Sequence, residues 1–255
     1  SRLLLRATFP WPGPALSIVM DDESDGEYED QTFTFGPHAI VASTIVELGL
    51  EALCELEANS DEISGQRAWP GSLLLCSFLL DAPAAVSGLK VLELGAGCGV
   101  CAMLAAKLGA ANVVASDGDD RCLKRLRDNV AKNFGGAGAC HAAELLWGDD
   151  DSLARFKSAH GTVFDVTLAG DVLYKHALVA PFVKTLAAVV SPGGTAYLCH
   201  LPRAGVEHID VTLALDTAGF DLEVCAVRAD LVVDGADCSA EDAQNAKLYK
   251  LTRRA

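Results

Sequence analysis

The sequence Leu-Lys-Val-Leu-Glu-Leu-Gly-Ala-Gly-Cys-Gly spans residues 89–99 and decides the fold. Its first half is rich in large apolar residues, which is typical of a strand buried on both faces. Its second half places glycine at every other position, and residues 100–108 continue with apolar residues at helical spacing. The stretch predicts a strand, a tight glycine turn and a helix. A nucleotide-type ligand could lie against the bare backbone of such a turn and face the helix N-terminus.

The composition is that of one large α/β domain with an extension. The chain has 255 residues, of which 51% are hydrophobic, enough to build a sizeable core. No run approaches the roughly 18 uninterrupted apolar residues of a membrane span. A net charge of −15 argues against a nucleic-acid surface, because phosphate recognition depends on clustered Lys and Arg.

The cysteines and histidines give no sign of metal chemistry. The nine cysteines are scattered and odd in number, which favours free thiols in a reducing compartment. Cys98 and Cys101 form a CxxC inside the glycine turn, with no second pair, and we interpret them as packing residues. Because the histidines also lack ligand spacing, we expect no metal site.

The N-terminal part is expected to form two segments ahead of the main domain. Residues 1–31 are interpreted as a flexible segment that ends in an acidic run, and a short targeting segment within them is left open. Residues 32–68 are interpreted as a β/α extension. Within it, residues 32–43 predict a hairpin, and residues 45–57 are interpreted as a short amphipathic helix.

From residue 69 to residue 255 the pattern alternates between strands and helices. Further strands are expected at residues 111–116, 139–146, 163–169, 195–200, 220–227 and 247–252. Helices are expected at residues 72–80, 119–134, 152–158 (capped by Ser152), 176–190 (closed by residues 191–194) and 205–218, with only a polar loop between the last two strands. This order predicts a doubly wound, mostly parallel seven-stranded sheet with an antiparallel hairpin at one edge.

In such a sheet the ligand binds beyond the carboxyl ends of the strands. This rule predicts that the glycine turn, Asp117, Trp147, Asp171 and His200 share one rim. His200 could lie near a substrate or be an ordinary, partly buried histidine.

The glycine spacing distinguishes between nucleotide cofactors. The nicotinamide fingerprint is G-x-G-x-x-G/A, whereas here the glycines follow G-x-G-x-G and the sixth position is Val100. Glu93 precedes the first glycine by two residues, and Asp117 follows the second strand, where it suits a ribose hydroxyl. No Gly-Lys-Ser/Thr follows, which excludes a P-loop. The stretch therefore favours S-adenosylmethionine (AdoMet) over NAD.

Several motifs in a fixed order resemble a known family. They are Ala68-Trp69-Pro70, residues 93–99, Ala115-Ser116-Asp117, Leu146-Trp147-Gly148, Gly170-Asp171-Val172-Leu173-Tyr174, and Arg203 after the fifth strand. From residue 69 to about residue 253 the chain resembles the seven-strand (class I) AdoMet-dependent methyltransferases, and more narrowly the family-16 protein-lysine methyltransferases. The resemblance implies a Rossmann-like fold and methyl transfer to a lysine side-chain amine of a protein substrate.

The resemblance also implies roles for individual residues. The predicted cofactor-binding residues are Trp69, Glu93, Gly95, Ala96, Gly97, Gly99, Asp117, Trp147, Gly170 and Asp171. Among these the glycine turn would hold the methionine part of AdoMet, Asp117 the ribose and Trp147 the adenine, and Trp69 would help close the site. Asp171 and Tyr174 are the predicted catalytic residues, facing the transferred methyl group and the amine. Arg203 is expected either to pair with an acidic neighbour or to contact substrate.

Other functions on the same scaffold stay open at this point. The acceptor could be a protein histidine or a small-molecule amine, and the chain could instead be a non-catalytic, AdoMet-binding partner subunit. An NAD-dependent oxidoreductase is a further alternative. We expect a cytoplasmic monomer that binds neither nucleic acid nor membrane.

Overall fold

The computed structural model describes residues 5–6, 17–19, 27–49, 65–135, 138–203, 205–228 and 238–255, without the side chains of residues 5–6, 17–19, 27 and 46–49. No helix within these ranges is long and apolar enough to cross a membrane.

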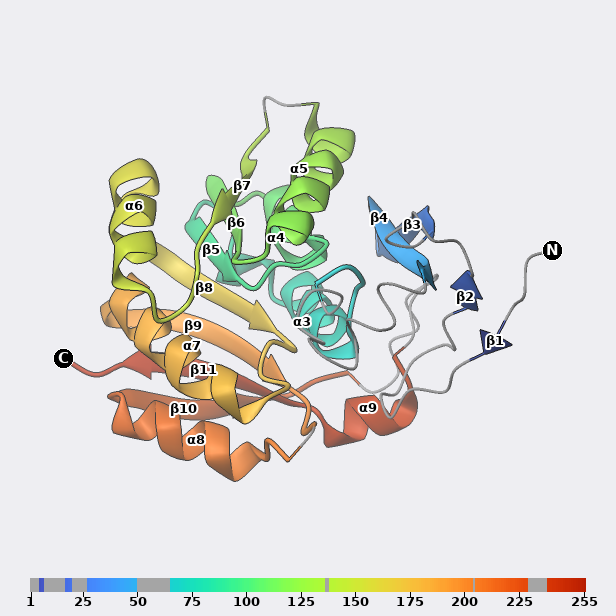
Figure 1. Ribbon diagram of the computed structural model, residues 1–255. Helices are drawn as coiled ribbons and strands as arrows, with labels where there is room; N and C mark the ends of the chain where they lie inside the picture. Colours follow the sequence, from blue (N-terminus) through green and yellow to red (C-terminus); the bar gives the residue numbers. More distant parts are fainter. Residues whose placement is uncertain are drawn as a thin grey trace.

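A seven-stranded sheet forms the centre of the main domain (Figure 1). Its strands are β5 (Lys90–Leu94), β6 (Asn112–Asp117), β7 (Cys140–Glu144), β8 (Phe164–Gly170), β9 (Val190–His200), β10 (Phe220–Cys225) and β11 (Lys247–Arg253), in the spatial order β10-β11-β9-β8-β5-β6-β7. The five strands from β7 to β9 pair in parallel, and β11 pairs antiparallel with both β9 and β10. The predicted doubly wound, mostly parallel sheet with antiparallel strands at one edge is confirmed.

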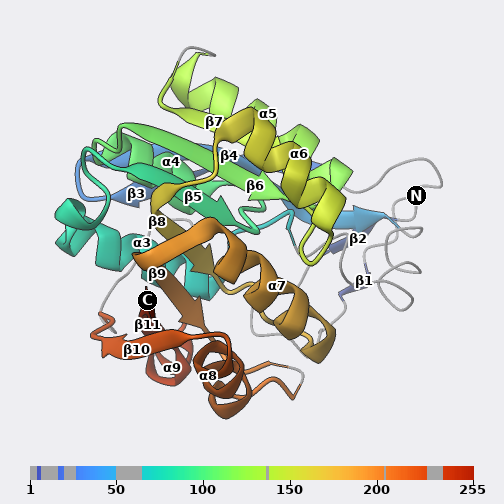
Figure 2. The ribbon, with the colours of Figure 1, turned by 90° about the vertical axis from the view of Figure 1, so that its left-hand side faces the viewer.

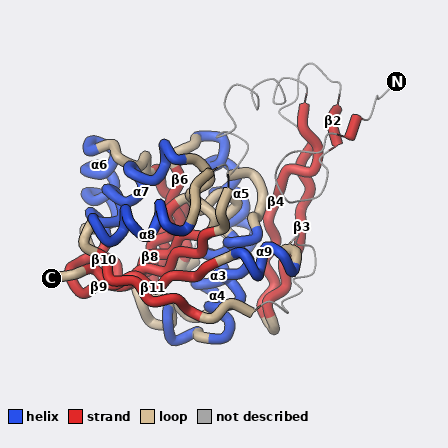
Figure 3. Tube along the Cα trace, turned by 90° about the horizontal axis from the view of Figure 1, so that it is seen from below, coloured by secondary structure: helices blue, strands red, loops and turns tan. Residues whose placement is uncertain are grey.

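Helices cover both faces of this sheet. One face carries α3 (Pro70–Asp81), α4 (Val100–Lys107) and α5 (Asp120–Phe134). The other face carries α6 (Asp150–His160), α7 (His176–Val189) and α8 (His208–Thr217), which Figure 2 shows lying across the sheet. Seen from below, the sheet is sandwiched between the two helical layers (Figure 3). The switch in strand order falls between β5 and β8, where doubly wound sheets bind their ligands.

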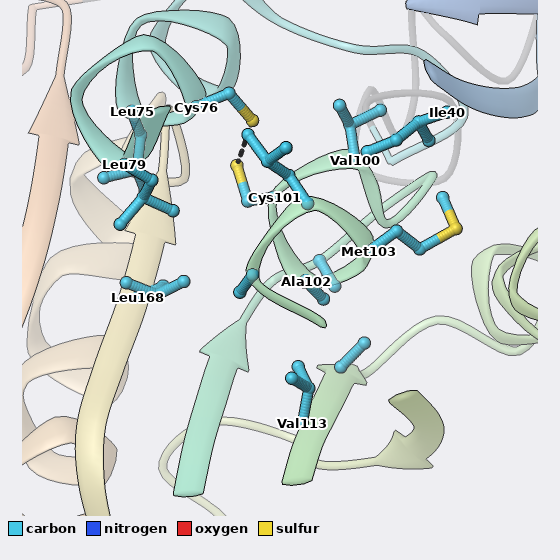
Figure 4. Packing of buried hydrophobic residues seen from close by; sticks show 14 of the residues in the cluster. Ile40, Leu75, Cys76, Leu79, Val100, Cys101, Ala102, Met103, Val113 and Leu168 are labelled. Atoms are coloured by element: carbon cyan, nitrogen blue, oxygen red, sulfur yellow. Dashed lines mark hydrogen bonds between the residues drawn. The ribbon is translucent and has the colours of Figure 1, made fainter. Parts of the chain in front are cut away.

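The core beside the glycine turn is built by α3 and α4. Pro70 occupies the first turn of α3, as predicted, where its missing N–H costs no hydrogen bond. Figure 4 shows Cys76 of α3 facing Cys101 of α4, and their sulfur atoms are 3.5 Å apart. Both side chains are buried among aliphatic neighbours. The CxxC cysteines Cys98 and Cys101 are therefore core residues, as interpreted from the sequence.

A long β-hairpin packs on the α3–α5 side of the domain. It consists of β3 (Glu27–Phe35) and β4 (His38–Gly49), and it belongs to a small sheet with β1 (Leu5–Arg6) and β2 (Ser17–Val19) in the order β1-β2-β4-β3. The predicted hairpin is confirmed, but its first strand begins at Glu27, inside the segment expected to be flexible. Tyr28 and Asp30 explain the difference, because they contact Arg125 and Lys132 of α5.

Two asparagines of α5 cover the exposed edge of β4. The Asn129 side chain accepts the Ser43 N–H at 2.8 Å and donates to the Cys98 carbonyl at 3.0 Å. Asn133 exchanges two hydrogen bonds with the backbone of Val41. Asn129 is fully buried and thereby ties the hairpin to the glycine turn.

Replacing Asn129 with alanine is expected to destabilise the protein by about 2 kcal/mol, because the buried Cys98 carbonyl and the partly buried Ser43 N–H would lose their partner. Urea unfolding measures the loss. Asp128→Ala is the matched control, since Asp128 is the exposed neighbour on the same helix, and its effect should stay within about 0.5 kcal/mol. Equal effects of the two substitutions would show that Asn129 does not anchor the hairpin.

Two of the expected segment boundaries are wrong. Residues 45–49 continue strand β4 instead of starting a helix, because Ile45 donates its N–H to the Gln66 carbonyl at 3.0 Å and the β-branched residues favour an extended backbone. Residues 50–64 of that expected helix and loop lie outside the described residues. Residues 191–194 do not form a separate loop after α7. They belong to β9, whose pairing with β8 shifts register between Val190 and Thr195.

One helix cap and one loop also differ from the expectation. The cap of α6 is Asp149, whose carboxylate accepts the Ser152 N–H at 2.6 Å, and not Ser152 itself. The supposed polar loop before the last strand contains the short helix α9 (Ala240–Asn245). A capping box between Ser239 and Asp242 starts this helix, and it packs against α3.

Candidate active site

A cavity of about 380 Å³ lies at the carboxyl ends of β5, β6 and β8. This volume falls within the usual range for small-molecule sites. The predicted residues that line it are Trp69, Glu93, Gly95, Ala96, Gly97, Asp117, Trp147, Gly170, Asp171 and Tyr174. Gly99 and His200 are not among the lining residues. Gly99 instead forms the N-cap of α4, and His200 is buried beside His208, with ring centroids 5.2 Å apart.

The glycine turn is in direct contact with residues 65–69, the segment that leads into α3. Gly97 has a φ of 53°, and a β-carbon at this position would lie 2.7 Å from the Gly65 carbonyl oxygen. Residues 65–69 therefore lie against the turn and wall one side of the cavity. Sequence reasoning missed Gly65 and Arg67 in this wall; the one signal for them is their position just before Trp69.

Asp117 stabilises the turn from below. One carboxylate oxygen accepts the Gly97 N–H at 2.9 Å, and the other accepts the Asp119 N–H at 3.1 Å. Burial raises the pKa of Asp117, and these backbone N–H groups partly offset the rise. Because a carboxylate oxygen accepts more than one hydrogen bond, Asp117 can also accept from a ligand hydroxyl.

Glu93 is a buried acid in the floor of the cavity. It is 2% exposed, and one oxygen accepts the Ala102 N–H of α4 at 2.8 Å. Burial raises the pKa of Glu93 from 4.5 to about 8. The carboxyl group therefore retains its proton at neutral pH as long as no positive charge lies beside it.

The Glu93 pKa predicts how stability depends on pH. Between pH 4.5 and about 8 the folded protein holds a proton that the unfolded chain releases, so stability falls as the pH rises through this window. Within this window Glu93 alone lowers the free energy of unfolding by about 1.4 kcal/mol per pH unit. Urea unfolding of Glu93→Gln at about pH 5 and pH 7.5 should therefore show a flatter dependence than that of the unsubstituted protein. Parallel curves would contradict the buried, protonated Glu93.

The Trp147 ring forms the wall opposite the hairpin side. It packs edge-on against Phe182 of α7, with centroids 5.2 Å apart. The next residue, Gly148, donates its N–H to Thr185 at 2.9 Å, which anchors this loop to the same helix. Trp147 thus presents a fixed aromatic surface to the cavity, suited to a planar base.

Asp171 has the most constrained conformation in the site. Its φ of 58° is the only positive value for a non-glycine residue in the described part of the chain. Arg203 donates to both carboxylate oxygens, at 3.1 and 2.6 Å, and Gly71 donates its backbone N–H at 3.2 Å. Arg203 therefore pairs with an acidic neighbour, the first of the two expected arrangements. Tyr174, half-buried, lies three residues further along the same loop.

The sequence of residues 51–210 matches the model of the lysine methyltransferase family. This match covers more than half of the chain. The chain belongs to the lysine methyltransferase family. The ordered motifs that suggested the resemblance all lie within the matched range, and each of them except Arg203 contributes residues to the lining of one cavity.

Individual relatives in this family include protein-lysine methyltransferases. The chain is 34% identical over 132 residues to the protein-lysine N-methyltransferase EFM3 of Chaetomium thermophilum, covering 50% of this chain and 39% of that protein. It is 31% identical over 138 residues to the EEF1A lysine methyltransferase 3 of Mus musculus, covering 54% and 56%. The chain thus matches only about two fifths to three fifths of the length of these relatives.

A solved structure confirms the fold. A Streptococcus mutans protein described as a SAM-dependent methyltransferase superposes with a TM-score of 0.59 over 93% of this chain and 58% of that chain. The two sequences are only 10% identical, so this similarity concerns the fold alone.

Proposed function

We propose that this lysine methyltransferase family member transfers a methyl group from AdoMet to a lysine side chain of another protein. The observation that carries the proposal is the single cavity that joins the glycine turn and Asp117 to Asp171 and Tyr174. Family membership supports the choice of lysine as the acceptor. The relatives named for lysine methylation support it further.

The residues present fit AdoMet. The glycine turn lines the cavity with backbone, Asp117 offers carboxylate oxygens to ribose hydroxyls, and Trp147 offers an aromatic face to the adenine. The buried acid Glu93 would become ionised beside a positively charged group. When bound, AdoMet supplies an activated methyl group on its sulfonium, and transfer leaves S-adenosylhomocysteine.

The protein's own contribution is to align the amine and keep it reactive. A free lysine has a pKa of about 10.4, so its amine must lose a proton to water before it attacks. We assign Asp171 to orienting the amine and Tyr174 to walling its path. Holding two reactants in line is the main requirement of a direct displacement.

Labelled AdoMet tests the proposal. Incubation of the protein with methyl-labelled AdoMet and cell extract should place label in protein, with S-adenosylhomocysteine as the second product. Label found only in low-molecular-weight products would favour a small-amine acceptor. AdoMet binding without any S-adenosylhomocysteine would favour the non-catalytic partner subunit, and tighter binding of NAD than of AdoMet would favour an oxidoreductase.

We also propose that the protein works as a monomer in the cytoplasm and does not bind nucleic acid. The eight cysteines within the described residues are free thiols, in keeping with a reducing compartment. The net charge of −15 supports a protein partner over a polyanion.

A further inference from the structure

Arg203 and Asp171 form a buried ion pair at the end of the cavity that we assign to the acceptor amine, the end lined by Asp171 and Tyr174. Asp171 lines the cavity, whereas Arg203, which follows β9, is not among its lining residues. The two side chains are only 2% and 5% exposed, with Asp171 the more buried. Both carboxylate oxygens accept from the guanidinium, an arrangement that fixes direction as well as distance. Arg203 can therefore act on the cavity only through its neighbours.

Asp171 is held by hydrogen bonds to the backbone of Cys199 and Gly71 as well as by Arg203. Its N–H donates to the Cys199 carbonyl at 2.8 Å, and Gly71 of α3 donates to its carboxylate. A β-carbon at Gly71 would lie 2.8 Å from the Asp171 β-carbon, so α3 and this loop are in direct contact. The left-handed backbone of Asp171 is thus maintained by contacts on three sides.

Arg203 also contacts Trp69, another residue that lines the cavity. Its guanidinium carbon lies 5.3 Å from the centre of the Trp69 ring, within the range of a cation–π contact. The Arg203 carbonyl accepts the Val206 N–H at 2.8 Å, which closes the turn that carries it. One side chain therefore supports both Trp69 and Asp171.

We infer that Arg203 is a positioning residue of the transfer reaction, holding Asp171 in place and pairing its charge so that the acceptor amine is not trapped as an ammonium ion. This inference rests on the proposed lysine methylation. It adds to that proposal a residue that touches neither substrate nor cofactor.

The physical reason lies in the charge that the amine meets. An unpaired carboxylate beside a lysine stabilises the ammonium form and raises the amine pKa, which removes the reactive neutral form. A guanidinium that binds both oxygens compensates that charge. The thiols of Cys199 and Cys238 also interact with Asp171, and burial raises their pKa, so they stay neutral. The Arg67 guanidinium lies over the Trp69 ring, 5.0 Å from its centroid.

The pH profile of methyl transfer tests the inference. With the protein substrate found for the unsubstituted enzyme, Arg203→Gln should lower the methyl-transfer rate at pH 7 about 10-fold, because the pKa of the acceptor amine rises. Near pH 9.5, where the amine loses its proton again, the rate of the variant should come within about 3-fold of the rate of the unsubstituted enzyme. Arg203→Lys keeps the charge but loses the two-point contact. It should lower the rate without shifting the profile. AdoMet affinity and the thermal midpoint are measured on each variant to verify folding.

A double variant separates charge from simple packing. Asp171→Asn combined with Arg203→Gln leaves no charge at the pair, so its profile should show no shift and its rate should exceed that of Asp171→Asn alone. Arg254→Gln is the control, because Arg254 pairs with Asp216 at 2.9 Å on the surface. It should leave the rate and the profile unchanged.

The outcomes are distinct. An Arg203→Gln variant that is folded but has an unshifted profile, or an equal loss at every pH, would overturn the inference. If that variant does not fold, the double variant decides: a rate no higher than that of Asp171→Asn would overturn it. Failure of the unsubstituted enzyme to methylate any lysine would overturn the proposed function, and this inference with it.

Discussion

Substituting arginine for Gly97 is expected to weaken AdoMet binding at least ~100-fold. Two costs combine at this position: the left-handed backbone disfavours any side chain, and the new β-carbon collides with the Gly65 carbonyl 2.7 Å away. The side chain would thus push residues 65–69 off the glycine turn and open the wall of the cavity. Isothermal titration with AdoMet measures the effect, and the thermal midpoint reports whether the variant folds.

The chain offers a matched control for this substitution. Gly88 has a φ of 73°, yet a β-carbon there would meet no heavy atom within 4 Å. Gly88→Arg therefore introduces a comparable backbone cost of about 1 kcal/mol without the collision. AdoMet affinity should be unchanged in Gly88→Arg, and an equal effect of the two substitutions would refute the role of the Gly97 contact.

Replacing Asp171 with asparagine is expected to lower methyl transfer at least ~100-fold while AdoMet affinity stays within about 3-fold. Asparagine is the informative choice, because it fits the left-handed backbone and still accepts a hydrogen bond. Alanine would remove the hydrogen-bond acceptor of the buried Arg203 guanidinium as well as its opposite charge, and would risk unfolding. With asparagine, the uncompensated guanidinium opposes the positive charge that develops on the acceptor nitrogen. Steady-state rates and AdoMet titrations measure the two quantities.

Asp165→Asn controls for the chemical change itself. Asp165 lies near the opposite end of β8 and accepts the Lys90 N–H at 2.8 Å, a bond that asparagine can keep. Its methyl-transfer rate should match that of the unsubstituted enzyme. If Asp171→Asn retains more than about a tenth of the rate, the role assigned to Asp171 is wrong.

Most of the fold was predictable because its signals are local. Strands β5, β6 and β8 are almost fully buried and read as apolar runs, and G-x-G-x-G marks the turn after β5. The order of strands and helices then fixes which carboxyl ends meet. This is why residues as far apart as Gly95 and Asp171 could be assigned to one rim.

The errors arose where short-range signals compete or are weak. Helix α9 has only six, mostly polar residues and no apolar periodicity; the capping box Ser239–Asp242 was the one signal for it. At α6, both Asp149 and Ser152 are good caps, and the backbone geometry decides between them. At residues 45–49, hairpin pairing overrides the amphipathic pattern.

The sequence predicted most of the residues that we assigned to the candidate site, but not which of them contact one another. The sequence left open whether Arg203 pairs with an acid or contacts substrate, and it could not identify Asp171 as the partner, because the two lie 32 residues apart and meet only in the folded sheet. The wall formed by residues 65–69 was missed for a similar reason. Its contact with Gly97 depends on how the chain enters α3, and no local pattern encodes that.

Mass spectrometry of the methylated protein tests the central claim most directly. After incubation with labelled AdoMet and cell extract, the labelled protein is isolated, digested and sequenced, with Asp171→Asn as the inactive control. We predict a methyl group on the side-chain nitrogen of a lysine, absent from the control reaction. Methylation confined to histidine, or to no protein residue at all, would contradict the account.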